Sequence, residues 1–320
     1  MGENFITNIE IEKYKCFNNF KADNFKRINL IGGKNNVGKT AFIESCYLVV
    51  SATRLSEFLF ALTMVEKNRD KLNIAIVNEI NILDILKENK SILINSLNNI
   101  KYLVKDESFN NSLEITLNDD SYEIDFSSKI LFNNVKHTLF IDNFGFTNNE
   151  LKDVYKAVQF KDKDIELNEF LKNFGFINPK FKIIDDKPYL KRDDNDEYNQ
   201  ISKYGDGIKH YISILCSLYS CENGYLFIDE VENGIHYILF EKLWEIIFKV
   251  AEEQNVQLFV TTHSKECIES YNRVSKKLTN IESKYFELAQ HQKKHNIFMR
   301  DLDEEQLEYE LTHNGRYRGE

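Results

Sequence analysis

The sequence predicts an α/β fold with a mostly parallel sheet that helices cover on both faces. Three short apolar runs that alternate with helical patterns carry this prediction: residues 27–32, 225–228 and 257–261. Continuous apolar runs are typical of strands buried on both faces, and strands that alternate with helices form parallel sheets. At 320 residues, the chain is long enough for one large domain or for two lobes of the usual ~150 residues.

Residues 1–50 predict antiparallel strands followed by a helix. Residues 8–17, NIEIEKYKCF, alternate between apolar and polar side chains, and residues 20–25 form a second, shorter run. The apolar run 27–32 ends in glycines, and from Lys39 onward apolar residues recur at helical spacing. We therefore expect an N-terminal antiparallel β part that leads into the parallel sheet.

The middle of the chain predicts an inserted, mainly helical lobe over residues 56–175. Residues 80–100 have the pattern of an amphipathic helix, and residues 148–173 that of a charged helix. Between them, residues 112–126 alternate about an Asn-Asp-Asp turn, as a hairpin does. The flanking segments, 1–55 and 176–320, would together form the main domain.

The C-terminal part alternates strands and helices more clearly. Residues 181–193 predict a hairpin, and a short strand at 297–300 precedes a helix. Helical patterns cover residues 207–221 and 235–252. These elements alternate with the apolar runs named above, so they belong to the same parallel architecture.

Composition favours a globular protein, which we expect to be soluble and cytoplasmic. Hydrophobic residues make up 42% and charged residues 29%, and the five cysteines have no metal-ligand spacing, so free thiols are expected. The N-terminus lacks the apolar core of a signal peptide. The most apolar window, residues 46–65, contains Arg54 and Glu57, which argues against a membrane span.

The net charge of −10 argues against a chain coated with basic surface. Contact with nucleic acid would need a local basic patch or a partner. Candidate patches are Lys276 with Lys277, and the stretch 291–295, in which Lys293 and Lys294 lie between histidines. Solvated helix faces are the alternative interpretation of both.

Residues 33–40, GKNNVGKT, match the P-loop pattern G-x-x-x-x-G-K-[ST] between a predicted strand and a predicted helix. Backbone N–H groups of such a loop surround phosphates, the lysine neutralises them and the hydroxyl binds Mg²⁺. A glycine turn with an incidental lysine is the alternative, which this context disfavours. We expect nucleotide contacts from Gly33, Asn35, Asn36, Val37, Gly38, Lys39, Thr40 and Ala41.

Two further strands deliver polar residues at their C-terminal ends, where ligands bind in open α/β sheets. The run 225–228 is followed by Asp229, a candidate Mg²⁺ ligand, and by Glu230, which could polarise an attacking water. The run 257–261 leads to His263, which could hydrogen-bond a γ-phosphate. A solvated strand end and a structural histidine are the alternative interpretations.

Residues 202–207, SKYGDG, precede a predicted helix. A Gly-x-Gly sequence at a helix start can present N–H groups to an anion, although a capped helix is the alternative. The candidate residues are Ser202, Gly205, Asp206 and Gly207.

In this order the motifs resemble the ABC-type ATPase superfamily, and within it the RecF/OLD-like branch known as AAA15 ATPases. The most specific likeness lies in IDEVENGIHY (228–237) and EKLW (241–244), and the resemblance covers residues 1–50 and about 176–320. It implies a P-loop NTPase fold of the ABC-ATPase type with ATP and Mg²⁺ as cofactors. On the same basis, residues 1–55 and 176–320 would be the ATPase head.

The resemblance also implies a head-to-tail homodimer with two ATPs between the subunits. Lys39 and Thr40 of one subunit would face the 202–207 signature of the other. Glu230 would be the general base for the attacking water, and His263 would be the switch that senses the γ-phosphate. Residues 232–236 would form the loop that crosses the dimer interface. The 202–207 sequence departs from Leu-Ser-Gly-Gly-Gln, and neither Gln159 nor Gln200 has the context of a Q-loop glutamine.

The leading functional hypothesis is an ATPase whose ATP-driven dimerisation regulates or scaffolds a partner effector, such as a nuclease or toxin, in DNA-linked or anti-phage defence processes. The alternative is an ATP sensor with negligible turnover that sequesters the effector. Residues 265–320 are too few for the TOPRIM domain of OLD-type nucleases, and we interpret Asp301-Leu302-Asp303 as a capping turn. The altered signature disfavours a transporter subunit, and the absence of Asn-Lys-x-Asp after the acidic strand disfavours a GTPase.

Overall fold

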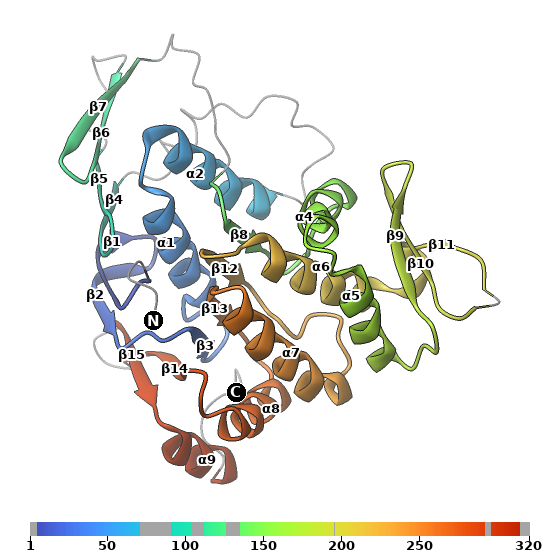
Figure 1. Ribbon diagram of the computed structural model, residues 1–320. Helices are drawn as coiled ribbons and strands as arrows, with labels where there is room; N and C mark the ends of the chain where they lie inside the picture. The colour runs from blue at the N-terminus through green and yellow to red at the C-terminus, as the bar shows by residue number, and fades with distance from the viewer. Residues whose placement is uncertain are drawn as a thin grey trace.

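A computed structural model describes residues 5–70, 91–103, 112–125, 135–194, 196–291 and 296–313. Its central sheet has six strands, five of them parallel, and the order places the three predicted apolar runs side by side (Figure 1). This confirms the mostly parallel sheet. The strands in order are β15 (Ile297–Leu302), β14 (Ser283–Gln290), β3 (Ile28–Gly32), β13 (Gln257–Thr261), β12 (Tyr225–Ile228) and β8 (Thr138–Ile141).

Successive side chains of the central strands enter two different cores. Leu226 and Leu258 belong to one buried cluster, whereas their neighbours Phe227 and Phe259 belong to the other. Because consecutive strand residues point to opposite faces, both faces of the sheet must be covered, as the apolar runs predict. The helices involved are α1 (Lys39–Ser51) on one face and α6 (Asp206–Ser220), α7 (Phe240–Glu253) and α8 (Lys265–Lys277) on the other.

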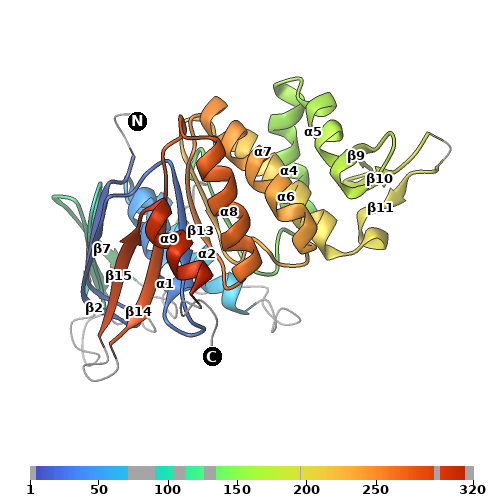
Figure 2. The same ribbon diagram turned by 90° about the horizontal axis from the view of Figure 1, so that it is seen from below.

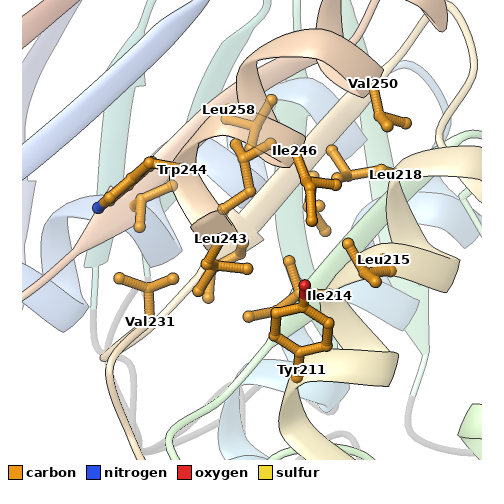
Figure 3. Close-up of a cluster of buried hydrophobic side chains, with 14 of the residues drawn as sticks. Tyr211, Ile214, Leu215, Leu218, Val231, Leu243, Trp244, Ile246, Val250 and Leu258 are labelled. Carbon is orange, nitrogen blue, oxygen red and sulfur yellow. The ribbon is translucent and has the colours of Figure 1, made fainter. Parts of the chain in front are cut away.

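The core between α6 and α7 is shown in Figure 3, where Tyr211 and Ile214 of α6 point toward Leu243 of α7. Trp244 is fully buried, and its indole Nε1 donates to the carbonyl oxygen of Cys267 on α8 (3.2 Å). This bond satisfies the one polar atom of the largest side chain in the core. The bond joins α7, which follows the 229–236 turn, to α8.

A second, antiparallel sheet contains the N-terminal strands and covers α1 from the side opposite the central sheet (Figure 2). Its described strands pair in the order β2-β1-β4-β5-β6-β7. The N-terminal β part and the 112–126 hairpin are confirmed. The strands are β1 (Asn8–Tyr14), β2 (Phe17–Asp23), β4 (Ser91–Asn95), β5 (Asn99–Leu103), β6 (Ser112–Leu117) and β7 (Asp120–Asp125).

The helix predicted over residues 80–100 is wrong for residues 91–100, while residues 80–90 lie outside the described ranges. Ile92 and Ile94 of β4 are buried with exposed or half-buried neighbours, which is the period of two of a strand. β4 pairs with β1 on one side and with β5 on the other. The helical pattern belongs to the longer window 80–100, and the pairing of β4 with β1 and β5 overrides it here.

The segment 56–175 contributes to both sheets. It follows the start of α2 (Leu55–Asp70), supplies β4 to β7 to the antiparallel sheet, and supplies β8 to the edge of the central sheet. The predicted charged helix 148–173 is two helices, α4 (Asn148–Phe160) and α5 (Asp164–Leu171), followed by η2 (Lys172–Phe174). The division into a head and an inserted lobe stays a prediction.

The remaining elements follow the sequence closely. A small sheet contains the predicted hairpin, and Asp303 caps the last helix by accepting from Gln306 N (2.8 Å), as the capping-turn interpretation predicts. The helix predicted from residue 235 begins later, because Gly234 (φ 70°) and the extended His236 form a turn first. These elements are β9 (Lys180–Ile184), β10 (Lys187–Lys191), β11 (Asn199–Gln200), η3 (Ile201–Tyr204), η4 (Tyr237–Leu239) and α9 (Glu304–Thr312).

All five cysteines lie outside disulfide bonds, as expected, and Cys16 is the exposed one. Across the described ranges, no helix combines the length and apolar character that a membrane crossing requires.

Candidate nucleotide-binding site

Residues 33–38 form a loop between the fully buried strand β3 and helix α1, as the P-loop pattern requires. Gly33 has φ 140°, and a Cβ there would lie 2.3 Å from the carbonyl oxygen of Leu288, so only glycine fits. Among the residues that the structure describes, no side chain caps α1, and its first turn contains no acid. The N–H groups at this helix start are therefore available to an anion.

Lys39 lies under the loop, where its Nζ donates to the carbonyl oxygens of Gly33 (2.9 Å) and Lys34 (3.0 Å). Burial lowers the pKa of Lys39, and the negative charges of nearby carboxylates, Asp229 first, oppose that shift. A buried ammonium that bonds neutral carbonyls gains from an anionic neighbour. A phosphate in the loop would supply one.

Asp229 follows β12 and binds two hydroxyl groups. Its Oδ2 accepts from Thr40 Oγ1 (2.8 Å), and its Oδ1 accepts from Thr261 Oγ1 (2.5 Å). Burial raises the pKa of Asp229 to about 6, and the two hydroxyl bonds partly offset that rise. The Asp229 carboxylate, at the end of β12, thus connects the start of α1 through Thr40 with the end of β13 through Thr261.

Thr40 and Asp229 fit a Mg²⁺ ion, which prefers oxygen ligands and usually keeps several waters beside one or two carboxylates and substrate phosphates. No group of three or more His, Cys, Asp or Glu side chains in the described ranges could hold a metal alone. Magnesium bound here would take its other ligands from phosphate and water, which is its usual mode with nucleotides.

Glu230 has φ 54°, a left-handed conformation that is uncommon for a residue other than glycine. Its backbone N donates to Thr261 Oγ1 (2.9 Å), the same hydroxyl that donates to Asp229. Such backbone strain is concentrated at functional sites, where surrounding contacts hold it. Thr261 therefore fixes both acids, a role that sequence reasoning missed because the residue was interpreted only as the end of a strand.

His263 follows β13 and faces two carboxylates. Its Nδ1 lies 3.2 Å from Glu232 Oε1 and 3.6 Å from Glu230 Oε1. The backbone N–H groups of His263 and Ser264 donate to the same oxygen of Glu232 (2.8 and 3.1 Å). These two hydrogen bonds to Glu232 therefore connect the turn that contains His263 with the turn after β12.

These residues enclose a cleft of about 520 Å³, a volume within the usual range for ligand pockets. The structure brings together the P-loop, the acidic strand end and the histidine, as the sequence predicts. Two of the predicted nucleotide contacts, Val37 and Gly33, do not line the cleft. Val37 is buried in the core with α1, and Gly33 packs against the backbone of Leu288. The lining residues are Asn35, Asn36, Gly38, Lys39, Thr40, Ala41, Asp229, Glu230 and His263.

Residues 202–207 are not among the described residues that line this cleft. Ser202, Gly205 and Asp206 are exposed, and no described atom lies within 4 Å of where a Cβ on Gly205 would be. Gly207 is buried instead, and a Cβ on it would lie 1.8 Å from the carbonyl oxygen of Gly234. Gly207 thus allows α6 to approach the turn after β12, and contact of this segment with a second subunit stays a prediction.

A second cleft of about 260 Å³ shares Thr40 and Asp229 with the first and is also lined by Glu44 and Asp142. Asp142 follows β8, and the pairing of Ile141 with Ile228 places it beside Asp229 at the sheet edge. Sequence reasoning missed this residue, although a signal was present. The letters LFID occur twice, at residues 139–142 and at 226–229.

The other sequence candidates lie elsewhere. Gln159 is in α4 and Gln200 in β11, and neither lines the two clefts among the described residues. Lys276 and Lys277 form ion pairs with Glu308 and Glu241, as solvated helix faces do. Residues 292–295, with the second basic candidate, lie outside the described ranges.

Comparison with known proteins places the chain in a family. The family described as "AAA domain, putative AbiEii toxin, Type IV TA system" matches residues 28–269. A Helicobacter pylori (strain ATCC 700392 / 26695) protein named ATP/GTP phosphatase is 24% identical over 331 residues, covering 84% of this chain and 88% of that protein.

Solved structures share the fold. An SMC head bound to the C-terminal winged-helix domain of ScpA has a TM-score of 0.53 at 11% identity, covering 93% of this chain and 98% of that chain. An SMC head domain with an extended coiled coil, bound to the C-terminal domain of ScpA from Pyrococcus furiosus, has a TM-score of 0.51 at 11% identity, covering 97% and 99%. The fold is that of these SMC heads, with a mostly parallel central sheet and an N-terminal antiparallel part, as the sequence predicts.

Proposed function

Because the chain belongs to the family of AAA domains that matches residues 28–269, we propose that it binds ATP with Mg²⁺ in the P-loop cleft and hydrolyses it to ADP and phosphate. One observation carries this proposal. Thr261 holds Asp229 and Glu230 together, and Asp229 bonds Thr40 at the uncapped start of α1. A phosphate group, a magnesium ligand set and a general base therefore fit within one cleft.

Each residue has a distinct role in the reaction. Lys39 and the loop N–H groups bind the β- and γ-phosphates. Thr40 and Asp229 would hold Mg²⁺, which would supply positive charge to neutralise the charge that develops on the phosphates. Glu230 orients a water and takes its proton as the water oxygen bonds to the γ-phosphorus. The bond from that phosphorus to the β–γ bridging oxygen breaks, and ADP leaves with the electron pair. His263 contacts the γ-phosphate and registers its loss.

We propose that two copies of the chain enclose ATP. Ser202 and Gly205 are exposed and lie outside the P-loop cleft of their own chain, so a second copy could present them to the γ-phosphate. Asp206 is exposed at the same helix start, whereas Gly207 acts through its packing within one chain. Residues 232–236 would cross the contact between copies, and the exposed Tyr237 and Ile238 follow them directly.

We place the chain in the RecF/OLD-like branch, with dimerisation in the cytoplasm regulating or scaffolding a protein effector such as a nuclease or toxin. Two observations support a partner. The matching family is described in terms of a toxin–antitoxin system, and the SMC heads of similar fold were solved with a bound ScpA domain. DNA-linked or anti-phage defence processes are the proposed setting, with nucleic acid as a further candidate partner.

The test is ATP turnover with and without double-stranded DNA, on the wild type and on Glu230→Gln, with mass measured by light scattering. We expect turnover by the wild type, and ATP-bound dimers that accumulate in Glu230→Gln because the base is lost while the binding residues remain. A Glu230→Gln protein that hydrolyses ATP at the normal rate would remove Glu230 from the base role. Tight ATP binding without wild-type turnover would favour a sensor that sequesters its effector.

A further inference from the structure

Glu232 is a buried carboxylate that contacts both the backbone and the ring of His263. Only 8% of the residue is exposed, and its Oε1 accepts from the backbone N–H groups of His263 (2.8 Å) and Ser264 (3.1 Å). The same oxygen lies 3.2 Å from His263 Nδ1. Buried carboxylates need such donors, because an unpaired buried charge is strongly disfavoured.

The hydrogen-bond donors that the structure describes around Glu232 all bond one of its two carboxylate oxygens, Oε1. Oε2 of Glu232 is buried and has no hydrogen-bond partner among the described residues. Burial raises the pKa of the Cys267 thiol well above its ordinary value, and the charge of Glu232 adds to that shift. A carboxylate serving only as a structural anchor would be expected to have both oxygens bonded. Here the bonds converge on the oxygen that faces the histidine.

The surroundings of the ring determine which nitrogen carries a hydrogen. Carboxylate oxygens only accept hydrogen bonds, and Nδ1 faces one from Glu232 and one from Glu230. Nδ1 is therefore the donor toward the protein. His263 lines the cleft, so Nε2 remains as the polar ring atom for a ligand.

We propose that Glu232 is a positioning residue, which fixes the tautomer and orientation of His263 and so determines that Nε2 is presented to the γ-phosphate. This inference rests on the proposed ATPase function. It also gives Glu232 a role within its own chain, where the family resemblance implies only that residues 232–236 cross the dimer interface. The closest oxygen contact of Nδ1, the buried charge and the unbonded Oε2 all lie on this one side chain.

A purely structural role and a positioning role for Glu232 predict different effects of the Glu232→Gln substitution. If Glu232 only anchors the backbone turn, Glu232→Gln should be silent, because its amide oxygen still accepts from the two N–H groups. If Glu232 positions the ring, the same substitution removes the negative charge that lies 3.2 Å from Nδ1 and so weakens the attraction that holds the ring. Glu266→Gln is the matched control, because Glu266 accepts from the Ser264 hydroxyl (3.0 Å) in the same turn.

The first readout is the ¹⁵N chemical shifts of the His263 ring, assigned by their loss in His263→Ala. In the wild type we expect a hydrogen on Nδ1 and a bare Nε2, and in Glu232→Gln a mixture of the two tautomers. Glu266→Gln should match the wild type. This measurement needs neither ATP nor turnover, so it tests the position of the ring even if the proposed ATPase activity fails.

The second readout is steady-state kinetics. We expect Glu232→Gln to lower kcat about tenfold with KM changed less than twofold, because the ring acts on the γ-phosphate during the reaction. In the His263→Ala background, Glu232→Gln should have no further effect, since it acts through the ring. Wild-type tautomer and kcat in Glu232→Gln, or a full additional loss in the double variant, would overturn the proposal.

Discussion

Because His210 is buried, we expect the free energy of unfolding to depend measurably on pH. His210 lies on α6, almost fully buried, and bonds the backbone of Val231 in the turn after β12. Its Nε2 has no hydrogen-bond partner in the described parts of the chain. Burial lowers the pKa of His210 from 6.5 to about 4, and the bond to Val231 only partly offsets this. Protonating the ring in the folded state would therefore place an uncompensated charge in the core.

The direction of the effect follows from proton linkage. Between pH 6.5 and about 4 the unfolded chain binds the proton and the folded chain does not, so stability falls as pH falls. The contribution of neutral His210 is fully present above pH 6.5. It is lost progressively down to about pH 4, where the loss reaches about 3 kcal/mol at ~1.4 kcal/mol per pKa unit.

The assay is urea unfolding at several pH values, without nucleotide, on the wild type and on His210→Gln, which keeps an N–H donor but does not titrate. Asp229 titrates in the same range with the opposite sign, because its raised pKa makes the folded state bind the proton first. Only the difference between the two proteins isolates His210. A difference in unfolding free energy that stays constant from pH 7.5 to 4.5 would refute the reasoning.

Three further substitutions test the site. In Lys39→Ala we expect ATP affinity, measured by calorimetry, to fall ~100-fold, because losing one partner of a buried charge pair costs about 2–5 kcal/mol; unchanged affinity would contradict the P-loop assignment. Thr261→Val removes the hydroxyl that bonds Asp229 and Glu230, so urea unfolding should show a loss of about 1–3 kcal/mol. A silent Thr261→Val would show that the two acids hold their places without it. Gly207→Ala would place a methyl 1.8 Å from a backbone oxygen, so its melting temperature should fall sharply, and a normal value would disprove that close approach.

The central fold could be predicted because its strands are buried on both faces. An apolar run such as Tyr225–Ile228, with one predicted helix before it and a second after it, is plausible only as a buried strand. Residues 91–100 could not be assigned correctly, because β4 is defined by its pairing with β1, more than seventy residues away in the chain. Short apolar patterns do not encode such long-range pairing, and tertiary contacts override them.

The P-loop site could be predicted because its parts lie in contiguous motifs whose chemistry is local. Lys39, Asp229 and His263 meet in one cleft, as their places at strand ends indicate. Asp142 and Thr261 were missed because their roles depend on which strands are neighbours, and that order is a property of the sheet. The repeated LFID sequence was available as a signal, but it gains meaning only when β8 and β12 lie side by side.

The turn after β12 connects parts of the site that sequence motifs present as separate. At its start, Glu230 is tied to Thr261 at the end of β13, and Glu232 is tied to the backbone of His263. At its end, the carbonyl oxygen of Gly234 packs against Gly207 at the start of α6. This turn therefore cannot shift as a unit without disturbing either the histidine turn or the helix that follows the 202–207 segment. A substitution in it should alter both regions together, so mutational effects at these positions should not be additive.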